Sequence, residues 1–190
     1  MDNSSTSDDR GLWLGTRYGR KYYTARPHPE DVFIDDIAAA LSRSCRYGGH
    51  TTRHYSVAEH SVRLAWIMRD AGFDVDIQQE ALMHDATEAY LCDIPRPVKP
   101  VLTNYKELEE LNWFAIARRF NLSPELDGVV ELADKAFPNL EKNYVMFNQP
   151  DYTQTTKPIP DWFPKKMHFV GWPAWLARWM FMREYRRLFC

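Results

Sequence analysis

The chain has 190 residues, 45% hydrophobic and 26% charged residues, and a net charge of −2, all ordinary for one globular domain. It has no long basic run and no apolar stretch of about 18 residues, so neither a nucleic-acid partner nor a membrane span is predicted. The three cysteines, Cys45, Cys92 and Cys190, lack CxxC spacing, which favours a reducing compartment, the cytoplasm.

The N-terminal part predicts little regular structure. Residues 1–10 are polar and acidic and predict a disordered tail, and residues 11–190 predict a single domain. Residues 13–23 combine aromatic residues and glycine with weak alternation, which indicates a short hairpin. A short helix is expected to begin at Asp35 and to carry Ile37 and Leu41.

The next helix is expected to point a histidine into the core. Ser56 is a suitable N-cap, and Gly72 is a suitable end. Between them Val57, His60 and Leu64 recur at helical spacing on one face. The imidazole of His60 is therefore predicted to face the interior.

A third helix, predicted over residues 76–91, carries more polar groups on its apolar stripe. Ile77, Ala81, His84 and Glu88 recur at helical spacing, and Asp85 follows His84 directly. Three prolines between residues 93 and 100 forbid continuation of the helix. Unpaired charge at buried positions is costly, so a partner such as a divalent cation is expected.

The rest of the chain predicts further helices. One is expected over residues 104–120, and Pro124 is expected to open another with Val130, Asp134 and Phe137 on its apolar stripe. Residues 149–173 show no sustained period, and a last amphipathic helix is expected from residue 173 to about residue 189. The predicted fold is therefore an all-α helical bundle, with a short N-terminal hairpin or extended segment.

Three separate predicted helices thus direct imidazole or carboxylate groups inward, which is unlikely to arise by chance. The groups belong to His60, His84, Asp85 and Asp134. Two imidazoles and two carboxylates suit one divalent ion of Mn, Co, Fe, Zn or Mg and leave positions open for water or substrate. The sequence therefore predicts one metal site, with the identity of the ion left open.

These residues and their surroundings resemble the HD-domain phosphohydrolases. The resemblance rests on the segments Val57-Ala58-Glu59-His60-Ser61, His84-Asp85-Ala86-Thr87-Glu88 and Asp93-Ile94-Pro95-Arg96-Pro97-Val98-Lys99, followed by Asp134. It covers roughly residues 31–137 and is greatest to bacterial 5′-deoxynucleotidases of the YfbR type and related phage and prophage hydrolases. It implies an HD-domain helical bundle, one catalytic divalent metal and a tendency to form homo-oligomers.

The resemblance also implies roles for individual residues. His60, His84, Asp85 and Asp134 match the metal ligands. Glu88 matches the carboxylate that orients or deprotonates the attacking water, and Asp93 matches a further acidic position of the site. These two are the expected catalytic residues.

Substrate contacts are expected from a basic and aromatic group. Arg46 and Tyr47 resemble an Arg-Trp pair that lies before the first histidine, and an arginine can bind a phosphate through two hydrogen bonds. His50 and Lys99 are further candidates for phosphate contact, although solvated side chains are equally ordinary. Cys92 occupies a position where a small glycine is expected.

The resulting functional prediction is a nucleotide phosphohydrolase. It would remove the 5′-phosphate from deoxynucleoside monophosphates by attack of a metal-activated water. One alternative uses the same site to release triphosphate or pyrophosphate from deoxynucleoside triphosphates. A second alternative, from another class, is a nucleotide-sensing or partner-binding module without turnover.

Overall fold

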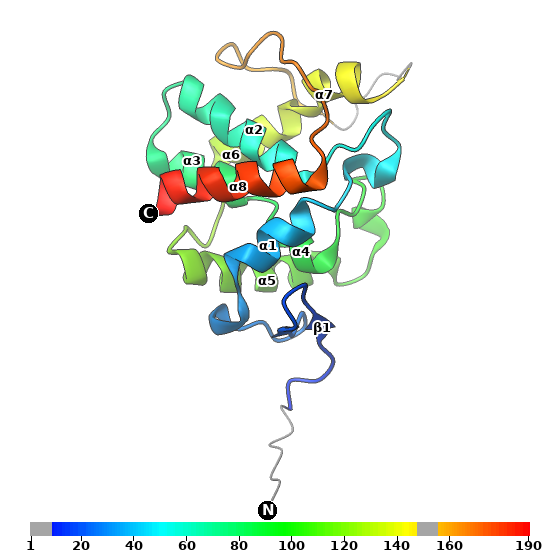
Figure 1. Ribbon diagram of the computed structural model, residues 1–190, viewed down its shortest axis with the longest axis vertical. Helices are drawn as coiled ribbons and strands as arrows, with labels where there is room; N and C mark the ends of the chain where they lie inside the picture. The colour runs from blue at the N-terminus through cyan, green and yellow to red at the C-terminus, as the bar shows by residue number, and fades with distance from the viewer. Residues whose placement is uncertain (1–8, 148–155) are drawn as a thin grey trace, which may run out of the picture.

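The computed structural model describes residues 9–147 and 156–190. They form an all-α fold with a short N-terminal strand pair, as predicted (Figure 1). The predicted tail, apart from Asp9 and Arg10, lies outside the described residues. The helices are α1 (Ile34–Leu41), α2 (Val57–Asp70), α3 (Val75–Met83), α4 (Glu88–Leu91), α5 (Tyr105–Phe120), α6 (Gly128–Ala136), α7 (Pro138–Val145) and α8 (Ala174–Phe189), with short 3₁₀ turns η1 (Pro29–Asp31), η2 (Arg46–Gly49) and η3 (Lys99–Val101).

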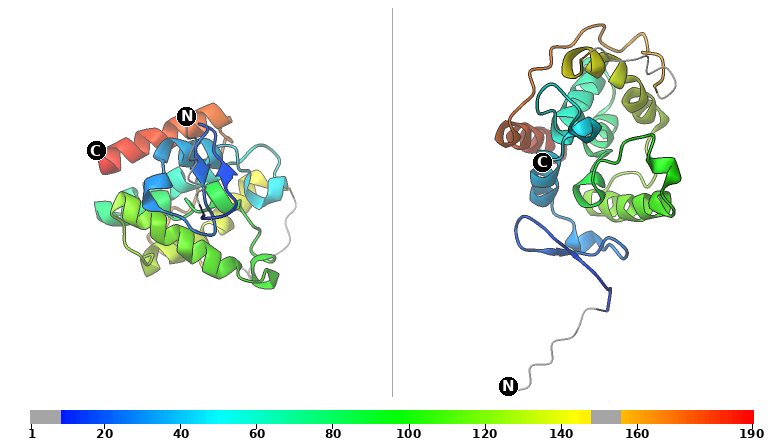
Figure 2. Two further views of the ribbon diagram at one scale, coloured as in Figure 1. Left: turned by 90° about the horizontal axis from the view of Figure 1, so that it is seen from below. Right: turned by 90° about the vertical axis from the view of Figure 1, so that its right-hand side faces the viewer.

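The predicted hairpin lies at one end of the helical body (Figure 2). Strand β1 (Leu14–Gly15) pairs antiparallel with β2 (Lys21–Tyr22). Two-residue strands contribute little stability alone. Tyr22 compensates because its ring stacks 3.5 Å from that of Tyr90 and its hydroxyl donates to Asn112 Oδ1 at 2.7 Å.

Helix α2 lies at the centre of the bundle, with α8 across it and α3 (Figure 1). Its N-cap is Ser56, as predicted, and the Ser56 hydroxyl accepts a hydrogen bond from the Glu59 amide at 3.1 Å. Eleven of its 14 residues are buried, so almost any side chain on this helix faces the interior. His60 is fully buried, which confirms its predicted direction.

The predicted third helix is wrong as a single element. It ends at Met83, and α4 begins at Glu88. Between them the amides of Ala86 and Glu88 donate to carbonyls three residues earlier, those of Met83 and Asp85. This tighter hydrogen bonding interrupts the α-helix, and a pattern of apolar residues does not reveal it.

The predicted start of the fifth helix, Pro124, is also wrong. Helix α6 begins at Gly128 because the Asp127 carboxylate caps it, accepting from the Val129 amide at 2.8 Å. Pro138 ends α6 and opens α7 at its first position, where a missing amide hydrogen costs nothing. Helix α7 was not predicted. The described residues 156–173 form no helix or strand, as expected, and residues 148–155 lie outside the description.

A buried ion pair on α2 holds the segment that precedes α8. The Arg63 guanidinium donates to Glu59 Oε1 at 2.7 Å, and the other oxygen of Glu59 accepts from the Trp172 amide at 2.6 Å. Gly171 lies next to this contact with a φ of +71°. A Cβ at Gly171 would lie 2.7 Å from the carbonyl oxygen of His54, so only glycine fits.

We expect Gly171→Ala to lower the free energy of unfolding by about 2–4 kcal/mol, from backbone strain and steric overlap together. Gly72→Ala is the matched control, because Gly72 has a φ of +83° and nothing within 4 Å of an added Cβ. It should lose only about 1–2 kcal/mol. Urea unfolding at a constant m-value measures both, and equal losses would contradict the predicted overlap.

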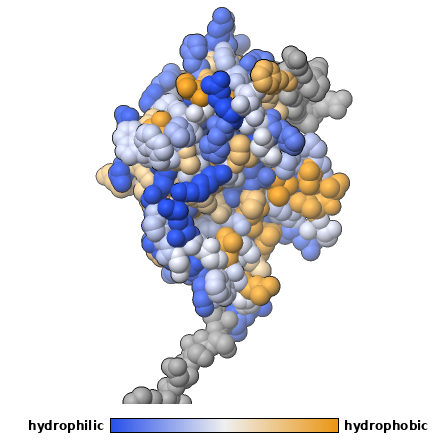
Figure 3. Space-filling view, turned by 45° about the vertical axis from the view of Figure 1, so that its right-hand side comes forward, coloured by the Kyte–Doolittle hydropathy of each residue, from blue (hydrophilic) through white to orange (hydrophobic). Residues whose placement is uncertain are grey.

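The surface is mixed in character. None of the described helices is both long and apolar enough to cross a membrane, and the three cysteines are free thiols. Figure 3 shows apolar side chains gathered in patches among hydrophilic ones. Among residues 9–147 and 156–190, the most exposed large apolar side chains are those of Leu12, Phe147, Val101 and Trp175.

Candidate metal centre

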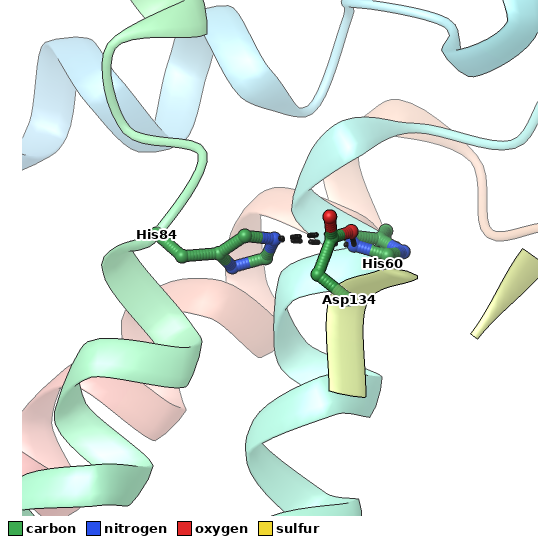
Figure 4. A group of neighbouring side chains, drawn as sticks. All are labelled: His60, His84 and Asp134. Atoms are coloured by element: carbon green, nitrogen blue, oxygen red, sulfur yellow. Dashed lines mark hydrogen bonds and ion pairs between the residues drawn. The ribbon is translucent and has the colours of Figure 1, made fainter. Parts of the chain in front are cut away.

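Three predicted ligands meet inside the bundle (Figure 4). His60 Nε2 lies 3.3 Å from His84 Nε2 and 3.3 Å from Asp134 Oδ1, and His84 Nε2 lies 3.7 Å from Asp134 Oδ1. Bonds of about 2.1 Å to one ion place neighbouring donor atoms about 3–3.5 Å apart. The group could therefore hold a metal ion.

Asp85 extends this group toward the predicted set. Its Oδ2 lies 3.2 Å from His84 Nε2 and 3.7 Å from His60 Nε2. Consecutive side chains of a regular α-helix diverge by about 100°. The interruption after Met83 therefore matters, because it allows His84 and Asp85 to reach the same point.

Glu141, on α7, is a site residue that the sequence analysis does not predict. It is fully buried, and its Oε1 accepts from His60 Nδ1 at 2.5 Å. This bond leaves His60 Nε2 free to face the other donors. The signal is present in the sequence, because Phe137 and Val145 lie on one apolar stripe at helical spacing and Glu141 interrupts it. Pro138, three residues earlier, hides this signal because a proline within a helical pattern indicates a break.

The centre favours positive charge. Burial opposes a charged imidazole, but the carboxylates of Asp85 and Asp134 raise the pKa of His84 to about 10. Burial would also raise the pKa of Asp134, yet the two histidines hold it well below its usual value. The pKa of Glu141 is also lowered, to about 2, because the charges of Arg46 and His60 outweigh the effect of burial. A divalent cation would supply the positive charge that these carboxylates favour.

Two arginines hold the carboxylates of the centre. Arg46 Nη1 donates to Asp85 Oδ2 at 3.2 Å, and Arg96 Nη2 donates to Asp134 Oδ2 at 2.7 Å. Asp134 therefore directs Oδ1 to the histidines and Oδ2 to Arg96. Arg96 lies in the proline-rich loop that follows α4. This loop therefore helps to orient a candidate ligand, Asp134.

A cavity of about 510 Å³ borders the centre, within the size range of small-molecule sites, about 300–1,000 Å³. The structure brings all the predicted catalytic and substrate-binding residues to its wall, together with two candidate ligands. These lining residues are Arg46, Tyr47, His50, Glu88, Asp93 and Lys99, with Asp85 and Asp134.

Glu88 is a buried carboxylate on this wall with an oxygen left unpaired by the described residues. Only 7% of it is exposed, and its Oε2 has no hydrogen-bond partner among the described residues. Burial, followed by the charges of Asp85 and Asp93, raises its pKa well above the usual value. A raised pKa makes the ionised carboxylate a stronger base near neutral pH.

The predicted substrate contacts differ in how they are held. Lys99 Nζ donates to Glu109 at 2.9 Å, and the Tyr47 hydroxyl donates to Glu141 Oε2 at 2.5 Å. Tyr47 has a φ of 58°, in the left-handed region. His50 lines the cavity, and its amide donates to the carbonyl of Tyr47.

Cys92 occupies a strained position between Glu88 and Asp93. Its φ of 68° and ψ of 157° lie in a region that glycine occupies almost alone. Relief of about 1–3 kcal/mol of strain, offset by about 0.5–1 kcal/mol of glycine entropy, should make Cys92→Gly more stable by about 1 kcal/mol. Urea unfolding tests this. Cys92→Ala retains the Cβ and should give no gain, so an equal gain in both variants would contradict the explanation.

Two known proteins are similar in sequence to this chain. No family model matches this chain. It is 38% identical over 122 residues to the uncharacterized protein YfdR of Escherichia coli, covering 64% of this chain and 66% of YfdR. It is 36% identical over 129 residues to the uncharacterized protein RCAP_rcc00048 of Rhodobacter capsulatus, covering 65% of this chain and 66% of that protein. Each match therefore spans just under two thirds of the relative's length.

Proposed function

We propose that this protein is a metal-dependent phosphohydrolase of the HD type, which removes the 5′-phosphate from deoxynucleoside monophosphates. One observation carries the proposal: Asp85 and Asp134 each place a carboxylate oxygen 3.2–3.7 Å from the Nε2 atoms of both His60 and His84, beside a cavity that Glu88 lines. The motif resemblance supports the HD family and the deoxynucleotide substrate class.

The metal would be held by His60, His84, Asp85 and Asp134. Their imidazole nitrogens and carboxylate oxygens suit Mn²⁺, Co²⁺, Fe²⁺, Zn²⁺ or Mg²⁺. The donor set fits a cation electrostatically as well, since its carboxylates raise the pKa of His84. Such an ion would lower the pKa of a nearby water molecule and neutralise negative charge on a phosphate.

Glu88 would act as the general base. Its buried Oε2 is free to accept a proton from the attacking water. Asp93 lines the same cavity, and its negative charge contributes to the raised pKa of Glu88. We assign to Asp93 the role of keeping Glu88 basic.

Arg46 would bind the phosphate. A guanidinium stays charged at any physiological pH and can donate two parallel hydrogen bonds to phosphate oxygens. Lys99 and His50 reach the same cavity from η3 and the end of η2. They would add positive charge or hydrogen bonds as the substrate enters.

The charge of the cavity favours a monophosphate over a triphosphate. The lining carries three cationic side chains and four carboxylates, so a divalent ion leaves it slightly positive. A phosphate monoester carries about two negative charges near neutral pH, whereas a triphosphate carries more. Hydrolysis of deoxynucleoside triphosphates by the same site is the second candidate.

Phosphate release from a panel of nucleotides tests this function. The panel contains deoxy- and ribonucleoside mono-, di- and triphosphates, each with Mn²⁺, Co²⁺, Zn²⁺ or Mg²⁺. We expect inorganic phosphate from deoxynucleoside monophosphates. Release of triphosphate or pyrophosphate would instead support the second candidate. If the metal-loaded protein released no phosphate from any of these nucleotides, the proposed enzymatic activity would be wrong. That result would support a nucleotide-sensing or partner-binding module.

The proposal also includes the oligomeric state and the cellular compartment of the protein. We expect a cytoplasmic homo-oligomer, supported by the free thiols and by exposed apolar side chains such as Val101 and Trp175. Light scattering coupled to gel filtration measures the oligomeric state, and a mass of one chain, 22.4 kDa, would contradict it.

A further inference from the structure

Glu141 receives hydrogen bonds from both sides of the site. Its Oε1 accepts from His60 Nδ1 at 2.5 Å and from the Tyr55 hydroxyl at 2.6 Å. Its Oε2 accepts from the Tyr47 hydroxyl at 2.5 Å and lies 3.6 Å from Arg46 Nη2. One oxygen therefore faces a candidate metal ligand, and the other faces two residues of the cavity wall.

We propose that Glu141 is a positioning residue that couples the metal centre to the substrate-binding wall, an inference that rests on the proposed function. Through Oε1 it orients the imidazole of His60 toward the ion. Through Oε2 it holds Tyr47 and Arg46 where a phosphate would bind. Binding at either place then strengthens binding at the other.

The metal side of this coupling follows from imidazole chemistry. A neutral histidine carries a proton on one ring nitrogen only. Because the Nδ1 hydrogen of His60 is donated to Glu141, Nε2 carries the lone pair that a metal needs. A carboxylate behind a ligating histidine also makes that nitrogen more basic.

The cavity side follows from the backbone of the η2 turn. Tyr47 is held in the left-handed region, which costs a residue with a side chain about 1–2 kcal/mol. The hydrogen bond to Glu141 opposes relaxation of this turn. Arg46 belongs to the same turn, so loss of the bond would move the phosphate-binding guanidinium as well.

A carboxylate is required because both oxygens must accept. An amide offers one acceptor oxygen and an NH₂ donor group. In a Glu141→Gln variant the NH₂ group would replace an acceptor oxygen that faces either His60 and Tyr55, which donate to it, or Tyr47 and Arg46, which donate to it or lie as a cation beside it. The variant keeps the shape of the side chain and breaks one of the two connections.

Metal titration of Glu141→Gln is the first test. Calorimetry with Mn²⁺ and the visible spectrum of the Co²⁺-loaded protein measure the site without relying on turnover. We expect metal affinity to fall by about 10–100-fold in either orientation of the amide, because the negative charge behind His60 is lost. Excess metal should restore most of kcat in Glu141→Gln and none in Glu88→Gln.

Tyr47→Phe and Tyr55→Phe form a matched pair, because each removes one hydroxyl from Glu141. Tyr55 is fully buried and shares Oε1 with His60, whereas Tyr47 lines the cavity. We expect Tyr55→Phe to weaken metal binding with little change in KM at saturating metal. Tyr47→Phe should raise KM several-fold under the same conditions. An identical response of both variants in KM would overturn the coupling.

These results separate the inference from the function on which it rests. Wild-type protein that binds no metal would overturn the proposed function. Wild-type protein that binds metal, with unchanged affinity and Co²⁺ spectrum in Glu141→Gln, would overturn the role of Glu141. A lower melting temperature of metal-free Glu141→Gln with an unchanged Co²⁺ spectrum would show a structural role only and would also overturn it.

Discussion

Glu88→Gln is expected to lower kcat by a factor of about 10²–10⁴, the usual contribution of a general base. The amide has nearly the shape of the carboxylate but cannot take a proton from water. Since Glu88 is not one of the four proposed ligands, metal affinity should stay close to that of the wild type. Steady-state kinetics and calorimetry measure the two quantities separately.

Glu80→Gln is the matched control for Glu88. Glu80 is equally buried, with 7% exposure, and burial raises its pKa too, but it accepts from the Asp127 amide and lies outside the cavity. Its kcat should change less than about threefold, since a retained oxygen can keep the hydrogen bond. Normal turnover in Glu88→Gln would refute its assignment as the base.

Asp85→Ala is expected to abolish both metal binding and turnover. It removes an oxygen within 3.7 Å of both imidazoles and leaves Arg46 with one fewer carboxylate partner. The positive charge of Arg46 would then be balanced, among the described residues, only by Glu141, 3.6 Å away, and would oppose a cation more strongly. Calorimetry or metal analysis after gel filtration measures the loss.

Asp93→Ala separates this effect from a general loss of negative charge. Asp93 lines the same cavity but is not one of the proposed ligands. This variant should still bind the ion and should lose rate instead. If Asp85→Ala retained the metal with wild-type affinity, Asp85 would not be a ligand.

Most of the fold follows from patterns that the sequence displays openly. Helices α2, α5 and α8 begin and end near their predicted limits, and α1 begins near its predicted start, because caps, glycines and apolar spacing agree there. The errors lie where local hydrogen bonding decides. The Asp127 cap makes α6 begin at Gly128 rather than at Pro124, and the tight turns after Met83 separate α3 from α4.

The site was predictable where it violates the pattern of buried apolar residues. His60, His84 and Asp134 each occupy an apolar stripe, and the structure brings them together. Glu141 violates the same pattern, but Pro138 concealed it by suggesting that the helix had ended. Arg96 could not be assigned from spacing, since only the folded loop places it beside Asp134.

The separation of the ligands along the chain has a thermodynamic consequence. Twenty-four residues separate His60 from His84, and Asp134 follows much later, in α6. An ion bound by all three would close two long loops at once and restrict the unfolded chain as crosslinks do. The folding equilibrium would then shift with free metal concentration, making resistance to heat a property of the buffer as well as of the polypeptide.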